Sequence, residues 1–216
     1  MDRQRGISLI SLLIGMLVSA IVLVAMLMIY RNTIQNVAPS SEGARVDGEI
    51  VSGLLAAHVM LHDAGFGIGG DGNGPEYGTH LRVLSGATLS NGSINGSVAD
   101  EGNAVIWTKQ INGDDFCEGL FADGEGGLWR VSSSSTSCTD ISSGIDGTAS
   151  PLIQPSRHPD GGVDAITFTY SPLSAGDACR PLGIGAGIAG IAAITITVEN
   201  STGHDIGSTT CLANFQ

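Results

Sequence analysis

Basic side chains are scarce in this 216-residue sequence. Lysine and arginine together number nine, against 21 aspartates and glutamates, and the formal net charge is −12. A surface with this excess of negative charge repels nucleic-acid phosphates and anionic lipid headgroups. We therefore expect no nucleic-acid partner for the acidic part of the chain.

Close cysteine pairs are also missing. The four cysteines lie in the second half of the chain, and the nearest two, Cys117 and Cys138, are 21 positions apart. Zinc sites usually take ligands from close pairs, so a metal site is the weaker interpretation. An even cysteine count suits disulfides in an oxidising compartment. Of three connectivities we favour Cys117 with Cys138 and Cys179 with Cys211, because each bond would close a loop rich in glycine and serine.

The sequence lacks an evident catalytic set. No Ser/His/Asp group, phosphate-binding loop or close carboxylate pair in a plausible pocket stands out. We therefore expect a protein that is not an enzyme and has no cofactor. Acidic residues from Asp114 to Glu125 surround Cys117, and we interpret this cluster as a solvated loop.

Two segments offer weak metal ligands. Asp71, Asn73 and Glu76 bring oxygen atoms into a tight loop, but the length and distal glutamate of a calcium-binding hand are absent. We expect a flexible turn there, with calcium as the alternative. His58 and His62 are spaced i, i+4 and could in principle hold a metal. Without an H-E-x-x-H arrangement we interpret them as ordinary surface histidines.

Long hydrophobic runs are limited to one. It follows Arg3 and Arg5, and extends from Ile7 to Tyr30 with no charged side chain. As a helix these 24 residues would reach roughly 36 Å, enough to cross a hydrocarbon layer of about 30 Å. Because the basic residues precede the run and the acidic bulk follows it, we expect a cytoplasmic N-terminus and an exported domain.

Small residues line one face of this predicted helix. Ser8, Ser11, Gly15 and Ser19 fall at spacings of three or four, so they share a face. In an apolar medium such a face lets another helix approach closely. It therefore favours contact with protein helices over contact with acyl chains.

The start of the run resembles a known processing site. Arg5-Gly6-Ile7-Ser8-Leu9-Ile10 is similar to the prepilin cleavage site of type IV pilins and type II secretion pseudopilins. The resemblance implies a leader at residues 1–6, cleavage after Gly6 by a prepilin peptidase, and N-methylation of Ile7. A cleaved secretory signal would have a shorter apolar region. A plain single-pass anchor would leave the small-residue face unexplained.

The segment 31–67 is predicted to continue the helix. Pro39 indicates a kink or break. From Arg45 to Asp63 the apolar residues recur at helical spacing: Ile50, Val51, Leu54, Leu55, Val59 and Leu61. The run Ala64-Gly65-Phe66-Gly67 is a stop signal. The end of this segment resembles the end of the long helix in W-type (PilW-like) minor pilins and the related J-type pseudopilins.

Residues 68–216 are predicted to form a β-rich domain, because short alternating runs are separated by Gly, Asn, Asp and Ser. The candidate strands are His80–Leu84, Ala104–Lys109, Leu128–Ser132, Val163–Tyr170, Ile191–Glu199 and one near Thr209–Ala213. The run 162–170 also resembles a Gly-x-Asp-aliphatic strand of the same minor pilin group. The sequence thus predicts an α+β fold, with a long N-terminal helix and an antiparallel sheet.

The resemblance implies a minor pilin of a type IV pilus-like filament, with other pilins, the prepilin peptidase and the inner membrane as partners. Its expected location is the inner membrane before assembly, with the domain in the periplasm, and the pilus or cell surface afterwards. Ser11 stands at the fifth mature position, where pilins usually carry Glu. This departure favours a tip or initiating position, and the alternative is that Ser11 is simply one more member of the small-residue face. The alternatives are a J- or K-like secretion pseudopilin, and an anchored binding protein or adhesin outside any filament. An anchored periplasmic enzyme has only the acidic clusters in its favour.

Overall fold

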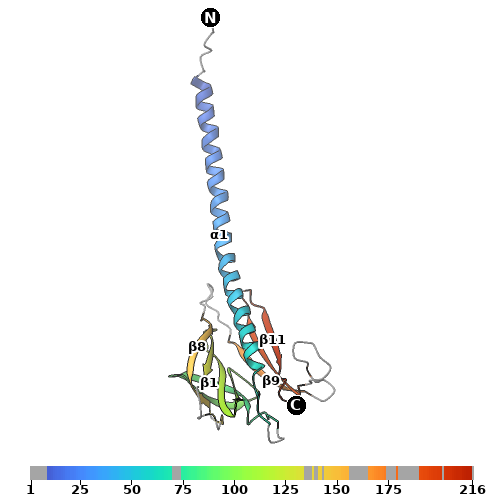
Figure 1. Cartoon of the computed structure of the whole chain (residues 1–216). Coiled ribbons are helices and arrows are strands. Elements are labelled where there is room, and N and C mark those ends of the chain that lie inside the picture. Colours follow the sequence, from blue (N-terminus) through green and yellow to red (C-terminus); the bar gives the residue numbers. More distant parts are fainter. Residues whose placement is uncertain are drawn as a thin grey trace. The chain divides into compact units, whose positions relative to one another are not determined.

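The computed structural model describes residues 9–69, 74–133, 138, 141–142, 144–155, 165–173, 179, 190–200 and 202–215, without the side chains of residues 38 and 39. The chain divides into two compact units, residues 1–45 and 46–216. The described elements are one helix, α1 (Leu9–Leu61), and eleven strands, so the fold is α+β (Figure 1).

The first unit contains the N-terminal part of α1. Uncharged aliphatic residues dominate its sequence, and a helix satisfies every backbone group within the segment, as an apolar medium requires. The break expected near Pro39 is not present, because α1 continues through residues 38–41. A proline removes one backbone donor, and the hydrogen bonds of the flanking turns can still hold a helix together.

The second unit begins with the C-terminal part of α1, which buries one stripe of apolar side chains. Val46, Ile50, Leu54, Ala57 and Leu61 recur every three or four residues and are at most 6 % exposed. The other predicted apolar positions are more than half exposed: Val51, Leu55 and Val59. The amphipathic pattern is therefore present, but its buried face is narrower than the list of apolar residues indicates.

Two antiparallel sheets complete the second unit (Figure 1). The larger has the order β7-β2-β1-β4-β5-β6-β8, and the smaller has the order β11-β10-β9-β3. The strands are β1 (Leu81–Ser90), β2 (Ser93–Ala99), β3 (Glu101–Gly102), β4 (Ala104–Ile111), β5 (Asp114–Ala122), β6 (Leu128–Ser132), β7 (Gly144–Asp146), β8 (Thr148–Ile153), β9 (Thr167–Pro172), β10 (Ala192–Glu199) and β11 (Asp205–Cys211).

The larger sheet is buried on both faces. Along β4 the side chains alternate, so that Val105 and Trp107 join a core shared with α1 and both sheets, whereas Ala104 and Ile106 join a second core. The second core includes Cys138, which a disulfide holds against β5. Burial on both faces explains why β4 reads as a continuous apolar run.

Two hairpins of the larger sheet turn on Asn-Gly. Asn91 and Gly92 connect β1 to β2, and Asn112 and Gly113 connect β4 to β5. All four residues have positive φ, between 52° and 90°. This is the conformation of the two-residue turn that matches the twist of antiparallel strands.

The predicted stop signal ends α1 by docking onto β4. The Gly65 amide donates to the Thr108 carbonyl at 2.9 Å, and the Gln110 amide donates to the Phe66 carbonyl at 2.7 Å. Gly65 and Gly67 have φ of 73° and 75°, and a side chain at Gly67 would meet the Gln110 carbonyl. The glycines are required because the chain is left-handed here and lies against another backbone.

The predicted strands agree in part with the observed ones. The bounds of β6 are as expected, and β1, β4, β9, β10 and β11 overlap their expected ranges. Residues 163–164 of the expected fourth strand lie outside the described residues, and β9 begins only at Thr167. The prediction of a solvated loop around Cys117 is wrong, because Asp114–Ala122 forms β5. Strands β2, β3, β7 and β8 were also not expected.

Candidate functional site

The apolar segment of α1 is the feature of the first unit that needs a partner. Its large apolar side chains from Leu9 to Tyr30 are 46 to 76 % exposed. The helix contains one stretch long and apolar enough to cross a membrane, and none of that stretch is buried within the protein. Water would solvate such a surface poorly, so the segment is suited to contact with lipid or with other apolar helices.

The small residues expected at helix contacts lie partly within the described chain. Ser11, Gly15 and Ser19 are exposed on α1, whereas Ser8 lies outside the described residues, as do Gly6 and Ile7 of the expected cleavage site. The Ser19 hydroxyl donates to the Gly15 carbonyl at 2.8 Å. Apart from the nearby backbone of α1 itself, no atom of the described residues lies within 4 Å of where a Gly15 side chain would begin, so a partner helix can approach the backbone here.

Both disulfides are in the second unit. Cys117 is bonded to Cys138, and Cys179 is bonded to Cys211, with Cα atoms 5.5 Å apart in each pair. This is the sequential pairing favoured from the sequence. The first bond ties Cys138 to β5, and the second ties Cys179 to β11, the edge strand of the smaller sheet.

The acidic cluster around Cys117 contains a buried carboxylate. Glu118 is 4 % exposed. The Arg130 guanidinium donates to its Oε1 atom at 2.7 Å, and the Lys109 ammonium lies 3.3 Å from the same oxygen. Lys109 also pairs with Asp63 at 3.2 Å. Glu118, with Lys109 and Arg130, therefore forms a network of opposite charges that joins β4, β5 and β6.

Of the calcium candidates, the structure describes one. Asp71 and Asn73 lie outside the described residues, and Glu76 is exposed. The Glu76 amide donates to His80 Nδ1 at 3.1 Å, and its carbonyl accepts from the His80 amide at 2.9 Å. The described residues contain no group of three or more His, Cys, Asp or Glu side chains placed to hold a metal.

Tyr77 and Tyr170 stack beside a surface cavity of about 290 Å³. Their ring centroids are 3.5 Å apart and the rings are nearly parallel, and the Tyr77 hydroxyl donates to the Ala99 carbonyl at 2.9 Å. Burial raises the pKa of Tyr77 to about 12 and also raises the pKa of Tyr170. Pro75, Ile191 and Phe215 line the cavity as well. Glu76 also lies in the lining, so the wall of the cavity is partly polar.

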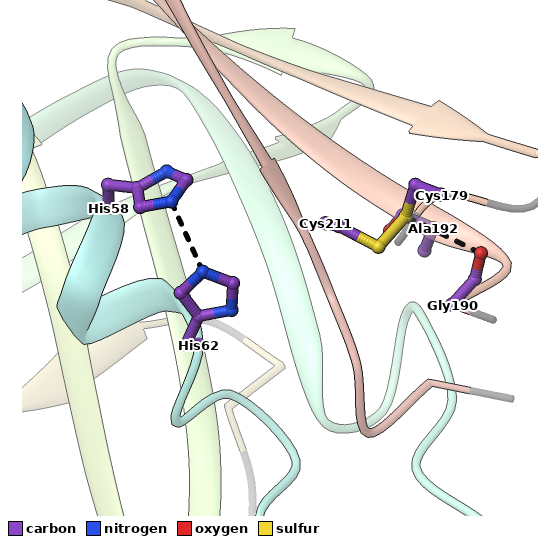
Figure 2. The surroundings of a disulfide bond; sticks show 6 residues. All are labelled: His58, His62, Cys179, Gly190, Ala192 and Cys211. Atoms are coloured by element: carbon purple, nitrogen blue, oxygen red, sulfur yellow. Dashed lines mark hydrogen bonds between the residues drawn. A yellow bond between two sulfur atoms is a disulfide. The ribbon is translucent and has the colours of Figure 1, made fainter. Parts of the chain in front are cut away.

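His58 and His62 are half-buried, which corrects the interpretation of both as ordinary surface residues. Their Nε2 atoms are 3.2 Å apart, and His58 Nδ1 lies 2.7 Å from the hydroxyl of Thr210 on β11. Burial, with a smaller contribution from His58, lowers the pKa of His62. Figure 2 shows the two rings beside the strand that carries Cys211.

Sequence reasoning missed three of these arrangements. Glu118 sits in the apolar run 116–122, and this pattern indicates a buried acid that needs cations nearby. Thr210 and the tyrosine pair had no local signal, because their partners are distant in the sequence. A comparison of the chain with protein-family models, curated proteins and solved structures finds no match in any of the three.

Proposed function

We propose that this chain is a minor subunit of a type IV pilus-like filament, which is processed after Gly6 and assembled through the N-terminal part of α1. The observation that carries the proposal is the exposed apolar surface of residues 9–30 with its small-residue face. A membrane can cover this surface before assembly, and other pilin helices can cover it afterwards. The leader motif at residues 3–10 supports the same function.

The proposed location follows from the charge distribution. Arg3 and Arg5 precede the apolar run, and the net negative domain follows it, so the N-terminus is cytoplasmic and the domain is periplasmic before assembly. Two disulfides in the second unit are in keeping with an oxidising compartment. The domain has no enzymatic role in this proposal, and no nucleic acid binds to it.

The mature N-terminus tests the proposal. In a host with a prepilin peptidase, mass spectrometry of the full chain should recover a terminal peptide that begins with N-methylated Ile7. Gly6→Val should block this processing, whereas Gly15→Ala, deeper in the helix, should leave it intact. An unprocessed Met1 in the wild-type chain would contradict the proposal and leave a simple membrane anchor.

Ser11 supports a position at or near the filament tip. A carboxylate at this position could neutralise the amine of a neighbouring subunit in a medium where an unpaired charge is unfavourable, but a serine cannot. The amine of this chain can still be neutralised by another subunit, so the chain suits an end of the filament better than its repeating shaft. Deletion should make filaments scarce, and labelling should find few copies per filament; labels along the whole shaft would contradict the placement. Loss of protein secretion with intact filaments would instead favour the pseudopilin alternative.

A further inference from the structure

The end of α1 presents two imidazole nitrogens to each other. His58 lies in the last turn of α1, and His62 follows the helix directly. Their Nε2 atoms are 3.2 Å apart, and the ring planes are nearly perpendicular, with centroids 4.7 Å apart (Figure 2). The i, i+4 spacing places the rings on one face, so the helix itself sets their separation.

Contacts with the C-terminal segment hold both histidines in place. His58 Nδ1 lies 2.7 Å from the hydroxyl of Thr210, which is fully buried. A hydroxyl can accept a hydrogen bond from Nδ1, and this tautomer leaves the lone pair of Nε2 free. The Asn214 amide donates to the His62 carbonyl at 3.2 Å and to the Ala64 carbonyl at 2.8 Å. The backbone that carries the second ring is thereby fixed.

We propose that His58 and His62 form a two-nitrogen chelate for a divalent transition-metal ion of the Zn²⁺, Ni²⁺ and Cu²⁺ class. An ion bound at about 2.0 to 2.1 Å from both Nε2 atoms would subtend an N–metal–N angle of about 100°, close to tetrahedral. Each neutral ring then carries its proton on Nδ1, and the ion takes the place of the hydrogen bond between the rings. Thr210 acts as the positioning residue for His58.

The ligand set determines the class of ion. Imidazole nitrogens suit Zn²⁺, Ni²⁺ and Cu²⁺, whereas Ca²⁺ and Mg²⁺ require oxygen ligands. Cys211 follows Thr210, so its side chain points to the opposite face of β11, and its sulfur is bonded to Cys179. Within the described chain no further His, Cys, Asp or Glu completes a group of three. Among the described residues the two imidazoles are thus the protein ligands, and water can take the remaining coordination positions.

Thermal unfolding with added metal tests the site. The full-length protein, purified in detergent without a histidine tag, should show a rise in Tm of a few degrees with excess Zn²⁺ or Ni²⁺ and none with Ca²⁺. His62→Gln keeps the His58–Thr210 contact and should abolish the rise. The matched control is His204→Gln, because His204 is exposed in the turn before β11 and should leave the rise unchanged. A rise that persists in His62→Gln, or its absence in the wild type, would overturn the proposal.

Two further measurements do not depend on Tm. The electron paramagnetic resonance spectrum of the Cu²⁺ complex should show coupling to two imidazole nitrogens in the wild type, and to one in His62→Gln. In the wild type, ¹⁵N NMR should show that Zn²⁺ shifts the Nε2 signals of His58 and His62, with Nδ1 protonated in both rings. Thr210→Val, which keeps the shape of the side chain but lacks the hydroxyl, should weaken Zn²⁺ binding. Copper coupled to a single nitrogen in the wild type, or zinc shifts confined to other histidines, would contradict the chelate.

Discussion

Glu118 on β5 accepts a 2.7 Å hydrogen bond from Arg130 on β6 while its own side chain is almost fully buried. Lys109, on the other side of β5, approaches the same oxygen at 3.3 Å. A buried carboxylate is tolerated only where cations and hydrogen bonds replace its water. The burial of Glu118 on β5 therefore depends on the cations of the two adjacent strands, Lys109 on β4 and Arg130 on β6.

Glu118→Ala should lower the free energy of unfolding by about 3 kcal/mol, because it leaves the mostly buried Lys109 without its buried partner. Urea unfolding of the full chain in detergent measures this change. Glu125→Ala is the matched control, since Glu125 is exposed in the same acidic segment and should change the free energy by less than about 0.5 kcal/mol. Equal effects of the two variants would show that Glu118 is not part of a buried network.

Gly67→Ala should destabilise the domain by roughly 1 to 3 kcal/mol, because it places a side chain at φ 75° and against the Gln110 carbonyl. Two glycines separate these causes. Gly113→Ala has a positive φ and open space, so it should show the backbone strain alone. Gly124→Ala has neither a positive φ nor a close contact, so it should be close to neutral. If Gly67→Ala were no worse than Gly113→Ala, the close approach to β4 would be unimportant.

Non-reducing peptide mapping should recover two linked species, Cys117 with Cys138 and Cys179 with Cys211. In the loop-entropy model each bond stabilises the domain by about 3 to 4 kcal/mol. Cys179→Ser combined with Cys211→Ser should therefore lower the urea midpoint substantially, without new disulfide partners for Cys117 or Cys138. Free thiols in the exported protein, or any crossed pair, would contradict this connectivity.

Alkaline pH should weaken the domain through Tyr77. Its pKa is about 12 in the folded protein, against about 10 in an unfolded chain. Between about pH 10 and pH 12 the folded state therefore binds more protons at this side chain than the unfolded state does. The free energy of unfolding must then fall as pH rises from about 10 to 12. Absorbance titration of the phenolates and unfolding at several pH values measure both effects. In Tyr77→Phe the latest phenolate transition should disappear and the fall in stability with pH should be shallower; an unchanged titration would assign that transition to another tyrosine.

The acidic segment Asp71 to Glu76 should not act as a calcium site. It matches no ligand spacing of known calcium loops, and the Glu76 backbone is already hydrogen-bonded to His80. Added Ca²⁺ should therefore change neither the Tm of the wild type nor the Tm of Asp71→Ala. A calcium-dependent rise that disappears in Asp71→Ala would show that the segment does bind the ion.

Local patterns of the sequence determined the helix and several strands. The apolar run before Arg31 predicts a spanning helix, since a helix depends on hydrogen bonds between residues four positions apart. The run at Leu128–Ser132 predicts β6 with its observed bounds. The pairing of the cysteines could also be chosen from loop composition. The helix and β6 depend on neighbours in the chain, so the sequence alone expresses them.

Only the tertiary structure decided which polar segments form strands and which polar groups meet. β2 is rich in Ser, Asn and Gly, and β5 begins with two aspartates, so neither has a strong strand propensity of its own. Both are held by Asn-Gly hairpins and by pairing with apolar strands. His58 and Thr210 are 152 positions apart, and their contact exists only because β11 packs beside α1. Such contacts arise from the folded core, and no local pattern in the sequence encodes them.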